Sequence, residues 1–462
     1  MPLQAEKTGL LGLVSFFAGL FLLGLAPLFR GGNRYVPLIG LEWLALGVLW
    51  LMATGHLLVR DTPLQASNAA SLAWGEWVLL LSPLWAALTF LVPVPMALWV
   101  ALPGHGLYLN ALDSSWRPLS LMPDATAASL MAGIPVVAAF ALSRTAQATL
   151  FRVLPPALVL LALVQAVWGL LQASVLKELY FGAEFAGGLI GSFANANHFA
   201  NYLAMTLPLA VFMVWRALPA PYAASRQRSP AAAALWSLVL LVLMAAVLAS
   251  GSRTGAVTAW LVTLLAMLLF LGGIGKSFRR RYALGAGALL LAVLVIVGVN
   301  NLLTRFDAGR LGDDVSIRWQ LAGSSWQAAL AFWPLGAGPG SFAAVYPQFQ
   351  PSGLGASVEH AHNDYVQLLM EFGVLSVALA GLAAWLVLRQ ALSLYRRLRV
   401  AGHEQSAARL QLCCGLGLLA LLLHSWVDFN LRIPANAMLA ACLLGAFLRP
   451  QPFAYEGEKA TC

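Results

Sequence analysis

The sequence predicts an all-α integral membrane protein with about twelve transmembrane helices and one large outer loop between the ninth and tenth. Its 462 residues are 60% hydrophobic and only 10% charged, whereas soluble domains are roughly half apolar and about a quarter charged. Apolar runs of about 18 residues or more, long enough to cross a bilayer, follow one another with few polar residues between them. Together these observations exclude a soluble globular protein.

The first apolar run, residues 10–29, is expected to be a permanent helix rather than a signal peptide. It is longer than a signal-peptide core, and its exit at Phe29, Arg30 and Gly31 offers no small-residue cleavage site. Further spans are expected near residues 36–57, 74–100, 126–143, 151–173, 195–215, 232–250, 254–272, 282–300, 364–388, 408–427 and 434–448.

The distribution of positive charge orients these helices. With the N-terminus inside, 18 of the 27 Lys and Arg residues fall on the inner side and 9 on the outer side, and cytoplasmic loops are the ones that collect positive charge. We therefore expect both termini to be cytoplasmic. Membrane topology then explains the net charge of +9, so this charge does not indicate a nucleic-acid partner.

One connection is much longer than the others, the outer loop at 301–363. Long loops in compact proteins are usually functional. Within it, residues 316–332 place apolar side chains at helical spacing, which predicts an amphipathic helix lying across the outer face. No separate soluble domain is visible, so residues 1–462 are expected to form a single polytopic membrane domain.

Several polar residues gather at the outer ends of the expected helices, where ionisable groups usually have a function because burying them in the membrane costs about 2.5–3.5 kcal/mol. At the start of the sixth span, His198, Asn201 and Tyr202 form one helical stripe next to Asn197. These side chains either form a hydrogen-bond network between helices or contact a substrate, for which Asn197 and His198 are the candidates.

Arg253 lies in the segment Ser-Gly-Ser-Arg-Thr-Gly at 250–255, in the outer turn between the seventh and eighth spans. Backbone N–H groups, a helix N-terminus and a guanidinium converge there, which favours an anion site. The alternative is an arginine that snorkels to lipid headgroups. Arg318, in the long loop, is a candidate second cation beside it.

His360 and His362 lie in the segment His-Ala-His-Asn-Asp-Tyr at 360–365, immediately before the tenth span. A neutral imidazole suits the removal of a proton from a hydroxyl group at neutral pH. Too few further ligands are near for a metal site, so no metal is expected. The alternative is that Asn363 or Asp364 caps the helix and that the histidines are incidental.

Two further segments are expected to be structural. A dinucleotide site at the glycine-rich run 336–342 would need a strand before it and a helix after it, and the run lies in the outer loop, where nucleotides are scarce, so it predicts a turn. At 424–434, His424 and Asp428 have i, i+4 spacing, and an ion pair of Asp428 with Arg432 would hold the loop. The four cysteines have no metal-ligand spacing and imply no disulfide framework.

The segments at 250–255, 336–342 and 360–365 together resemble the O-antigen ligase and polymerase superfamily, and the resemblance is strong over about 190–380. It implies transfer of a glycan from undecaprenyl diphosphate to an acceptor hydroxyl at the periplasmic face of the bacterial inner membrane. His362 then takes the catalytic role, and Arg253 and Arg318 bind the diphosphate. His360 and Asn363, like the two residues of the sixth span, are possible substrate contacts.

The ligase pattern is matched by His362, Asn363 and Gly373, but Ser376 stands where ligases have Gly, Thr or Tyr. The resemblance therefore leaves a ligase, with lipid A–core as acceptor, and a polymerase, with a second lipid-linked glycan as acceptor, both open. Attack by the acceptor hydroxyl opposite the diphosphate leaving group would invert the anomeric centre, and because this leaving group is already activated, we expect a metal-independent reaction without a cofactor. A protein O-oligosaccharyltransferase ranks third, because that branch carries an additional C-terminal region. A transporter or flippase ranks last, because the expected midplane segments are plain apolar residues.

Overall fold

The computed structural model describes residues 2–59, 73–111, 115–174, 188–218, 229–271, 308–353, 357–398 and 404–449. Within these ranges the chain is almost entirely helical, and eight segments are long and apolar enough to cross a membrane. The all-α integral membrane fold predicted from the sequence is thereby confirmed. The expected ninth span, 282–300, lies outside the described residues, so the count of twelve stays a prediction.

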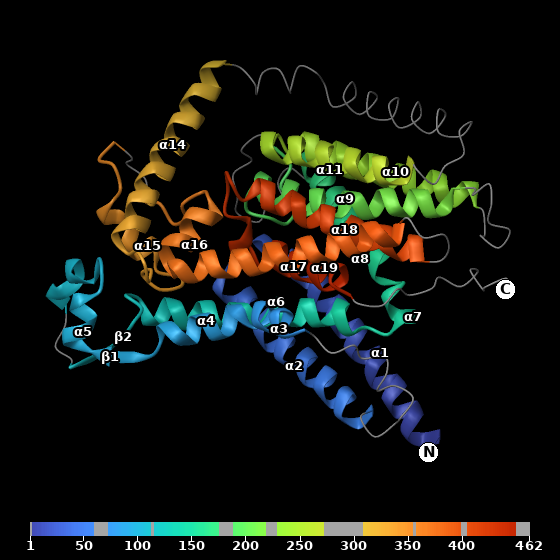
Figure 1. Ribbon diagram of the computed structural model, residues 1–462. Helices are drawn as coiled ribbons and strands as arrows, with labels where there is room; N and C mark the ends of the chain where they lie inside the picture. Colours follow the sequence, from blue (N-terminus) through green and yellow to red (C-terminus); the bar gives the residue numbers. More distant parts are fainter. Residues whose placement is uncertain are drawn as a thin grey trace.

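The long apolar helices form one bundle (Figure 1). They are α2 (Tyr35–Val59), α6 (Pro123–Thr145), α7 (Ala148–Phe151) with α8 (Leu154–Ser174), α9 (Ala196–Ala217), α10 (Pro230–Ala249), α11 (Arg253–Leu271), α17 (Val374–Leu398) and α18 (Glu404–His424). Shorter apolar stretches occur in α1 (Pro2–Leu25) and in α19 (Pro434–Phe447).

The α9 helix is the centre of this bundle. Its whole span is buried, and it packs against α8, α10, α11, α18 and α19. Either lipid or neighbouring helices can cover an apolar membrane helix, and around α9 it is helices that do so. Small residues let these neighbours approach closely: a Cβ atom at Gly417 of α18 would lie 2.4 Å from the carbonyl oxygen of Met205. Polar residues at the start of α9 are therefore held in fixed positions.

The expectation of one continuous span over 74–100 is wrong. This run is divided into α3 (Trp74–Leu80), α4 (Ser82–Phe90), β1 (Pro93–Pro95) and α5 (Met96–Ala101). After η2 (His105–Ala111), β2 (Trp116–Pro118) pairs antiparallel with β1. The run is apolar enough for a span, but Pro83, Pro93 and Pro95 each lack a backbone N–H and fix φ, so they interrupt a helix.

The expected tenth span is also divided, because α16 (Asp364–Phe372) ends at Gly373 and α17 begins at Val374. Gly373 has φ 54°, and a Cβ atom there would lie 2.0 Å from the carbonyl oxygen of Pro334. Only glycine tolerates both the conformation and this close approach. The result is a corner that separates the short helix following the histidine pair from the membrane-spanning helix.

The glycine-rich run at 336–342 is the turn that the sequence predicts, and it packs on this corner. Gly336 and Gly338 have φ of 91° and 105°, and the Gly338 N–H donates to the carbonyl oxygen of Glu371 at 2.9 Å. The turn leads into α15 (Phe342–Val345) and η3 (Tyr346–Gln348).

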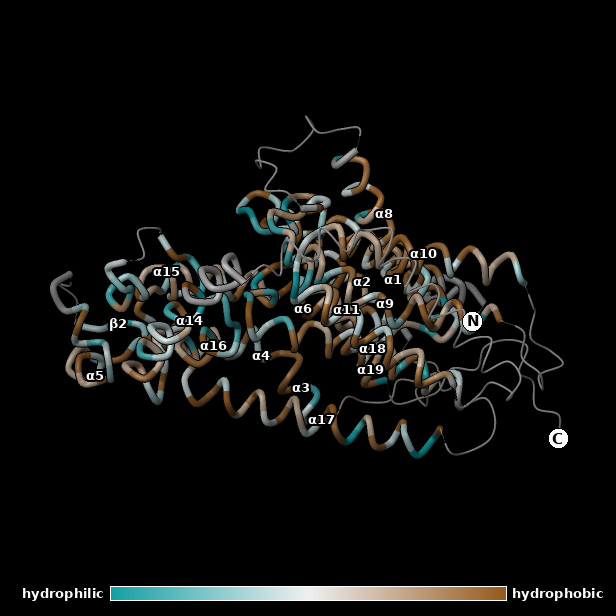
Figure 2. The backbone as a smooth tube through the Cα atoms, turned by 90° about the horizontal axis from the view of Figure 1, so that it is seen from above, coloured by the Kyte–Doolittle hydropathy of each residue, from teal (hydrophilic) through white to brown (hydrophobic). Residues whose placement is uncertain are grey.

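A helix covers the segment expected to be amphipathic: α14 (Ala308–Ala331), which runs across the bundle helices rather than along them (Figure 1). Trp319 and Ile317 are exposed on it, whereas Leu321 and Ala328 are buried. The buried side packs against α16. Figure 2 shows hydrophobic residues along most of α8, α10 and α17, and interleaved hydrophilic residues around α14 and α16.

Replacing Gly373 by alanine is expected to destabilise the protein by about 2 kcal/mol or more, because alanine at this φ is strained and its methyl group meets the Pro334 carbonyl. The apparent Tm of the purified protein in detergent should fall by several degrees. Gly381 is the matched control, since it lies inside α17 and a Cβ atom there meets nothing within 4 Å. An equal Tm for Gly373→Ala and Gly381→Ala would contradict the structural role of the corner.

Candidate active site

A buried carboxylate, Asp428, is the centre of a polar cluster at the α14–α16 end of the bundle. It lies four residues after the end of α18 and is 0% exposed. The Asn197 side chain donates to its Oδ2 at 2.7 Å, and the Phe429 backbone N–H donates to its Oδ1 at 3.0 Å. His362 Nδ1 lies 3.2 Å and His198 Nε2 3.6 Å from the same Oδ1. Three segments far apart in the sequence therefore meet at one carboxylate.

This environment keeps Asp428 ionised. Burial alone raises the pKa of the carboxyl group, but the contacts with the His198 and His362 rings, and the charge that these rings carry when protonated, outweigh it and hold the pKa well below its usual value. Asp428 is thus a fixed negative charge at neutral pH. A carboxylate in contact with an imidazole orients the ring and stabilises its protonated form.

His362 has the geometry of a general base. Its side chain is 34% exposed, and because Nδ1 faces Asp428, Nε2 lies on the opposite side of the ring. The edge of the ring meets Phe429 at a centroid distance of 4.9 Å. Its backbone has φ 48°, a left-handed conformation that is uncommon for a residue other than glycine and costs on the order of 1–3 kcal/mol. The surrounding contacts hold the residue in place despite this cost.

Asn363 caps the helix that follows. Its Oδ1 accepts hydrogen bonds from the backbone N–H groups of Tyr365 and Val366 at 3.0 and 3.1 Å. The capping role that the sequence left open is therefore present, and it fixes the chain directly after His362. Asp364 adds a second constraint, since its buried Oδ2 accepts from the Leu431 N–H at 3.0 Å. Burial is the main cause that raises the pKa of Asp364 to about 7.

His360 has a different environment from His362. Its ring stacks on Phe429 at 4.2 Å, and its Nδ1 lies 3.3 Å from the Gln367 amide nitrogen. Burial, with a contribution from the charge of Arg432, lowers the pKa of His360 to about 4, so the ring is neutral at neutral pH. With one nitrogen committed to Gln367 and one face covered, His360 is less available to a substrate than His362.

The expected ion pair of Asp428 with Arg432 is wrong. Arg432 Nη2 instead donates to Glu371 Oε2 at 2.7 Å, and the chain does not continue as a helix after His424 but turns through η4 (Asn430–Arg432). Helical i, i+4 spacing therefore does not apply to this loop. Arg432 thus ties this loop to α16, whereas Asp428 faces the rings of His198 and His362.

Arg318 lies beside the loop that carries Asp428. Its Nη1 donates to the backbone carbonyl of Val427, the residue before the buried carboxylate, while Arg318 as a whole is exposed. The α14 helix thus places this guanidinium against the loop that carries Asp428. The sequence identified Arg318 as a candidate second cation, which the resemblance assigns to the diphosphate, and in the structure it contacts the loop that carries Asp428.

Arg253 is the first residue of α11 and is half-buried. The first turn of α11 packs tightly on α9, because a Cβ atom at Gly255 would lie 2.5 Å from the Cβ of Ala200. Ala200 is two residues beyond His198. The Arg253 segment and the start of α9 are therefore neighbours at the same end of the bundle.

The sequence left Asp428 out of the candidate site, and Gln367 and Glu371 were not identified at all. For Asp428 a signal existed: it is an ionisable group at the outer end of an expected span, which is the signal that selected His198. Among the residues that the structure describes, no group of three or more His, Cys, Asp or Glu side chains is placed to hold a metal ion.

Residues 236–381 match the sequence family described as O-antigen ligase. This stretch contains Arg253, Arg318 and His362, whereas the residues that surround the imidazole from α9 and from the loop after α18 lie outside it. No curated protein sequence matches the chain. The family match covers about a third of the chain and, together with the multi-helix membrane fold, supports the resemblance to the O-antigen ligase and polymerase superfamily, whose members are membrane glycosyltransferase-like enzymes.

Proposed function

We propose that the protein is an O-antigen ligase-type glycosyltransferase that moves a glycan from undecaprenyl diphosphate to a hydroxyl group of lipid A–core. The observation that carries the proposal is the contact between His362 Nδ1 and the buried Asp428 carboxylate at 3.2 Å. Such a pair leaves the other ring nitrogen available to accept a proton, which is what an acceptor hydroxyl requires.

In the proposed reaction, His362 Nε2 takes the proton of the acceptor hydroxyl as its oxygen attacks the anomeric carbon of the donor sugar. The attack comes from the side opposite the bond between that carbon and the diphosphate oxygen. This bond breaks, and the configuration of the anomeric carbon inverts. Asp428 stabilises the imidazolium that forms. The proton then passes from His362 to solvent or to the departing diphosphate.

Arg253 and Arg318 are the proposed diphosphate ligands. Negative charge grows on the bridging phosphate oxygen as the bond breaks, and guanidinium groups stabilise this charge more in the transition state than in the ground state. The carrier diphosphate is already an activated leaving group, so the proposal includes neither a metal nor a cofactor. Its partners are the lipid-linked donor, the lipid A–core or glycan acceptor, and membrane lipids.

The proposed location is the bacterial inner membrane, with both termini cytoplasmic and the active site at the periplasmic face. The excess of Lys and Arg on the inner side of the expected topology supports this orientation. The position of the polar cluster at one end of the bundle, rather than at mid-depth, supports a transferase over a transporter or flippase.

A polymerase of the same superfamily is the second candidate, and Ser376 is the residue that favours it, because it departs from the ligase pattern. The chemistry is the same, but the acceptor is a second lipid-linked glycan. The Ser376 hydroxyl donates to the Gly373 carbonyl at 2.6 Å within the corner before α17.

Deletion of the gene distinguishes the two candidates when lipopolysaccharide from the cells is resolved on a gel. Loss of a ligase is expected to leave core without any O-chain and long glycan on the carrier. Loss of a polymerase leaves core that carries one repeat unit. An unchanged banding pattern would contradict both assignments to lipopolysaccharide. Complementation with the intact gene is the control.

A further inference from the structure

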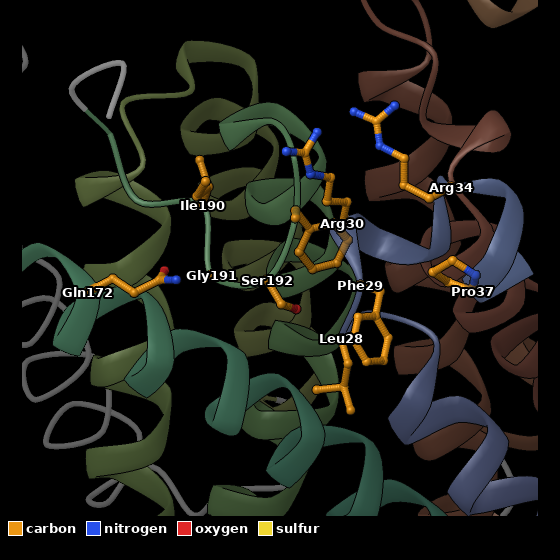
Figure 3. A pocket seen from close by; sticks show the side chains of 10 residues that line it. Leu28, Phe29, Arg30, Arg34, Pro37, Gln172, Ile190, Gly191 and Ser192 are labelled. Carbon is orange, nitrogen blue, oxygen red and sulfur yellow. The ribbon is translucent and has the colours of Figure 1, made fainter. Parts of the chain in front are cut away.

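A pocket with a volume of 260 Å³ lies between the α1–α2 turn and the loop at 188–193. Its apolar wall includes Leu28, Phe29, Pro37 and Ile190, and two arginines, Arg30 and Arg34, line it as well. Figure 3 shows both guanidinium groups extending to the same side, away from Leu28 and Phe29. The pocket therefore combines an apolar wall with two positive charges at one end.

The floor of the pocket is fixed by hydrogen bonds. The Ser192 N–H donates to Gln165 Oε1 at 3.1 Å, and the Ser192 hydroxyl lies within reach of both Gln165 Oε1 and the Pro27 carbonyl. Gly191, at φ 57°, passes so close to Phe199 that a Cβ atom would lie 2.8 Å from the ring. The loop is thus tied to α8, to α9 and to the end of α1 before any ligand binds.

The surroundings of the pocket are suited to lipid. Arg34 is exposed, and the start of α2 directly after it exposes Tyr35 at 88% and Val36 at 81%. Guanidinium groups bind phosphate through charge-assisted hydrogen bonds. A small soluble anion gains nothing from the apolar wall, and an uncharged lipid gains nothing from two arginines, so the combination fits a lipid with a phosphate group.

The pocket adjoins the loops of the active site. A Cβ atom at Gly31, between the two arginines in the sequence, would lie 2.8 Å from Phe193 and 2.9 Å from Ile433. Phe193 precedes Asn195, which caps α9, and Ile433 follows the loop that contains Asp428. A ligand in the pocket is therefore in contact with a turn that packs on both loops around His362.

We propose that Arg30 and Arg34 bind the phosphate of a phosphorylated membrane lipid whose hydrocarbon chain lies along Leu28, Phe29 and the start of α2. This inference rests on the proposed function. Because Arg253 and Arg318 are assigned there to the donor diphosphate, we assign the lipid in this pocket as the acceptor. The pocket then holds the acceptor lipid by a group that does not react, while its hydroxyl extends toward the imidazole.

Lipid binding tests the site without any need for glycan transfer. The purified protein in phosphatidylcholine nanodiscs is titrated with phosphatidic acid, and the apparent Tm is measured. Arg34→Glu is expected to weaken binding about tenfold or more, because a charged hydrogen bond is replaced by repulsion, while Arg34→Lys keeps most of it. Arg117→Glu is the matched control, since Arg117 lies over the Trp99 ring at 5.3 Å and not in the pocket.

Two outcomes overturn the binding site. Equal weakening by Arg34→Glu and Arg117→Glu would show that only the general surface charge attracts the lipid. Equal stabilisation by inorganic phosphate and by phosphatidic acid would show that the pocket takes a free anion rather than a lipid.

Transfer kinetics then separate this inference from the proposed function. Arg34→Glu is expected to raise the KM for the acceptor about tenfold with kcat little changed, and an unchanged KM would overturn the assignment to the acceptor. His362→Ala is expected to bind phosphatidic acid normally while losing transfer. If His362→Ala retains transfer, the catalytic proposal fails although the lipid site stands.

Discussion

Replacement of His362 by alanine is expected to lower the rate of glycan transfer by about 10²- to 10⁴-fold, the usual contribution of a positioned general base. Within the described cluster, the substitution removes the one ring that both contacts Asp428 and is partly exposed to an incoming substrate. The measurement is transfer from a lipid-linked glycan to purified acceptor, followed on a gel with the protein in detergent.

The fold should survive this change, because the His362 ring is one-third exposed and its removal leaves little buried space. The extraction yield and apparent Tm of His362→Ala should therefore match those of the unaltered protein. His360→Ala is the comparison variant and is expected to lose less activity, since His360 Nδ1 already faces Gln367. Full activity of His362→Ala would refute the catalytic assignment.

Replacement of Asp428 by asparagine is expected to lower transfer by about 10²-fold or more, although Asp428 does not touch the substrate. Asparagine keeps the shape of the side chain but removes the negative charge that stabilises the imidazolium. It also replaces one carboxylate oxygen by an NH₂ group, so either the hydrogen bond from Asn197 to Oδ2 or that from the Phe429 backbone N–H to Oδ1 is lost. The same transfer assay measures the loss.

A double variant distinguishes positioning from a general loss of structure. If Asp428 acts through His362, then Asp428→Asn combined with His362→Ala should be no slower than His362→Ala alone, because residues that act as a unit are not additive. Asp364→Asn is the matched control, a buried aspartate whose pKa of about 7 makes a neutral side chain tolerable. A further rate loss in the double variant, or an equal loss in Asp364→Asn, would contradict the role of Asp428.

Much of the fold follows from apolar length, and most long runs became helices close to the expected ranges. The exceptions depend on single residues within apolar runs. Pro83, Pro93 and Pro95 divide the run at 74–100, and Gly373 divides the run at 364–388. Hydropathy does not register these residues as interruptions, because the summed hydrophobicity of the run remains high. Local backbone chemistry decides where such a helix ends.

The candidate site was only partly predictable, for a physical reason. Arg253, Arg318 and His362 lie in short local segments whose residue types indicate chemistry. Asp428 depends instead on tertiary packing that brings it to Asn197, 231 residues away in the sequence. Its nearest sequence neighbours suggested an ion pair with Arg432, which the turn at η4 prevents. Local spacing predicts contacts only where the local secondary structure is known.

The corner at Gly373 has a consequence for how the site behaves in lipid. Only 6% of the residues in the α17 span are buried, so most of this helix faces lipid, while one side packs on α18 and Arg389 pairs with Glu76. The helix after His362 is anchored elsewhere, through the Leu431 N–H on Asp364 and the ion pair of Arg432 with Glu371. The short helix after His362 is thus held by contacts of its own and not only through α17, so we expect the imidazole to keep its place in membranes of different thickness.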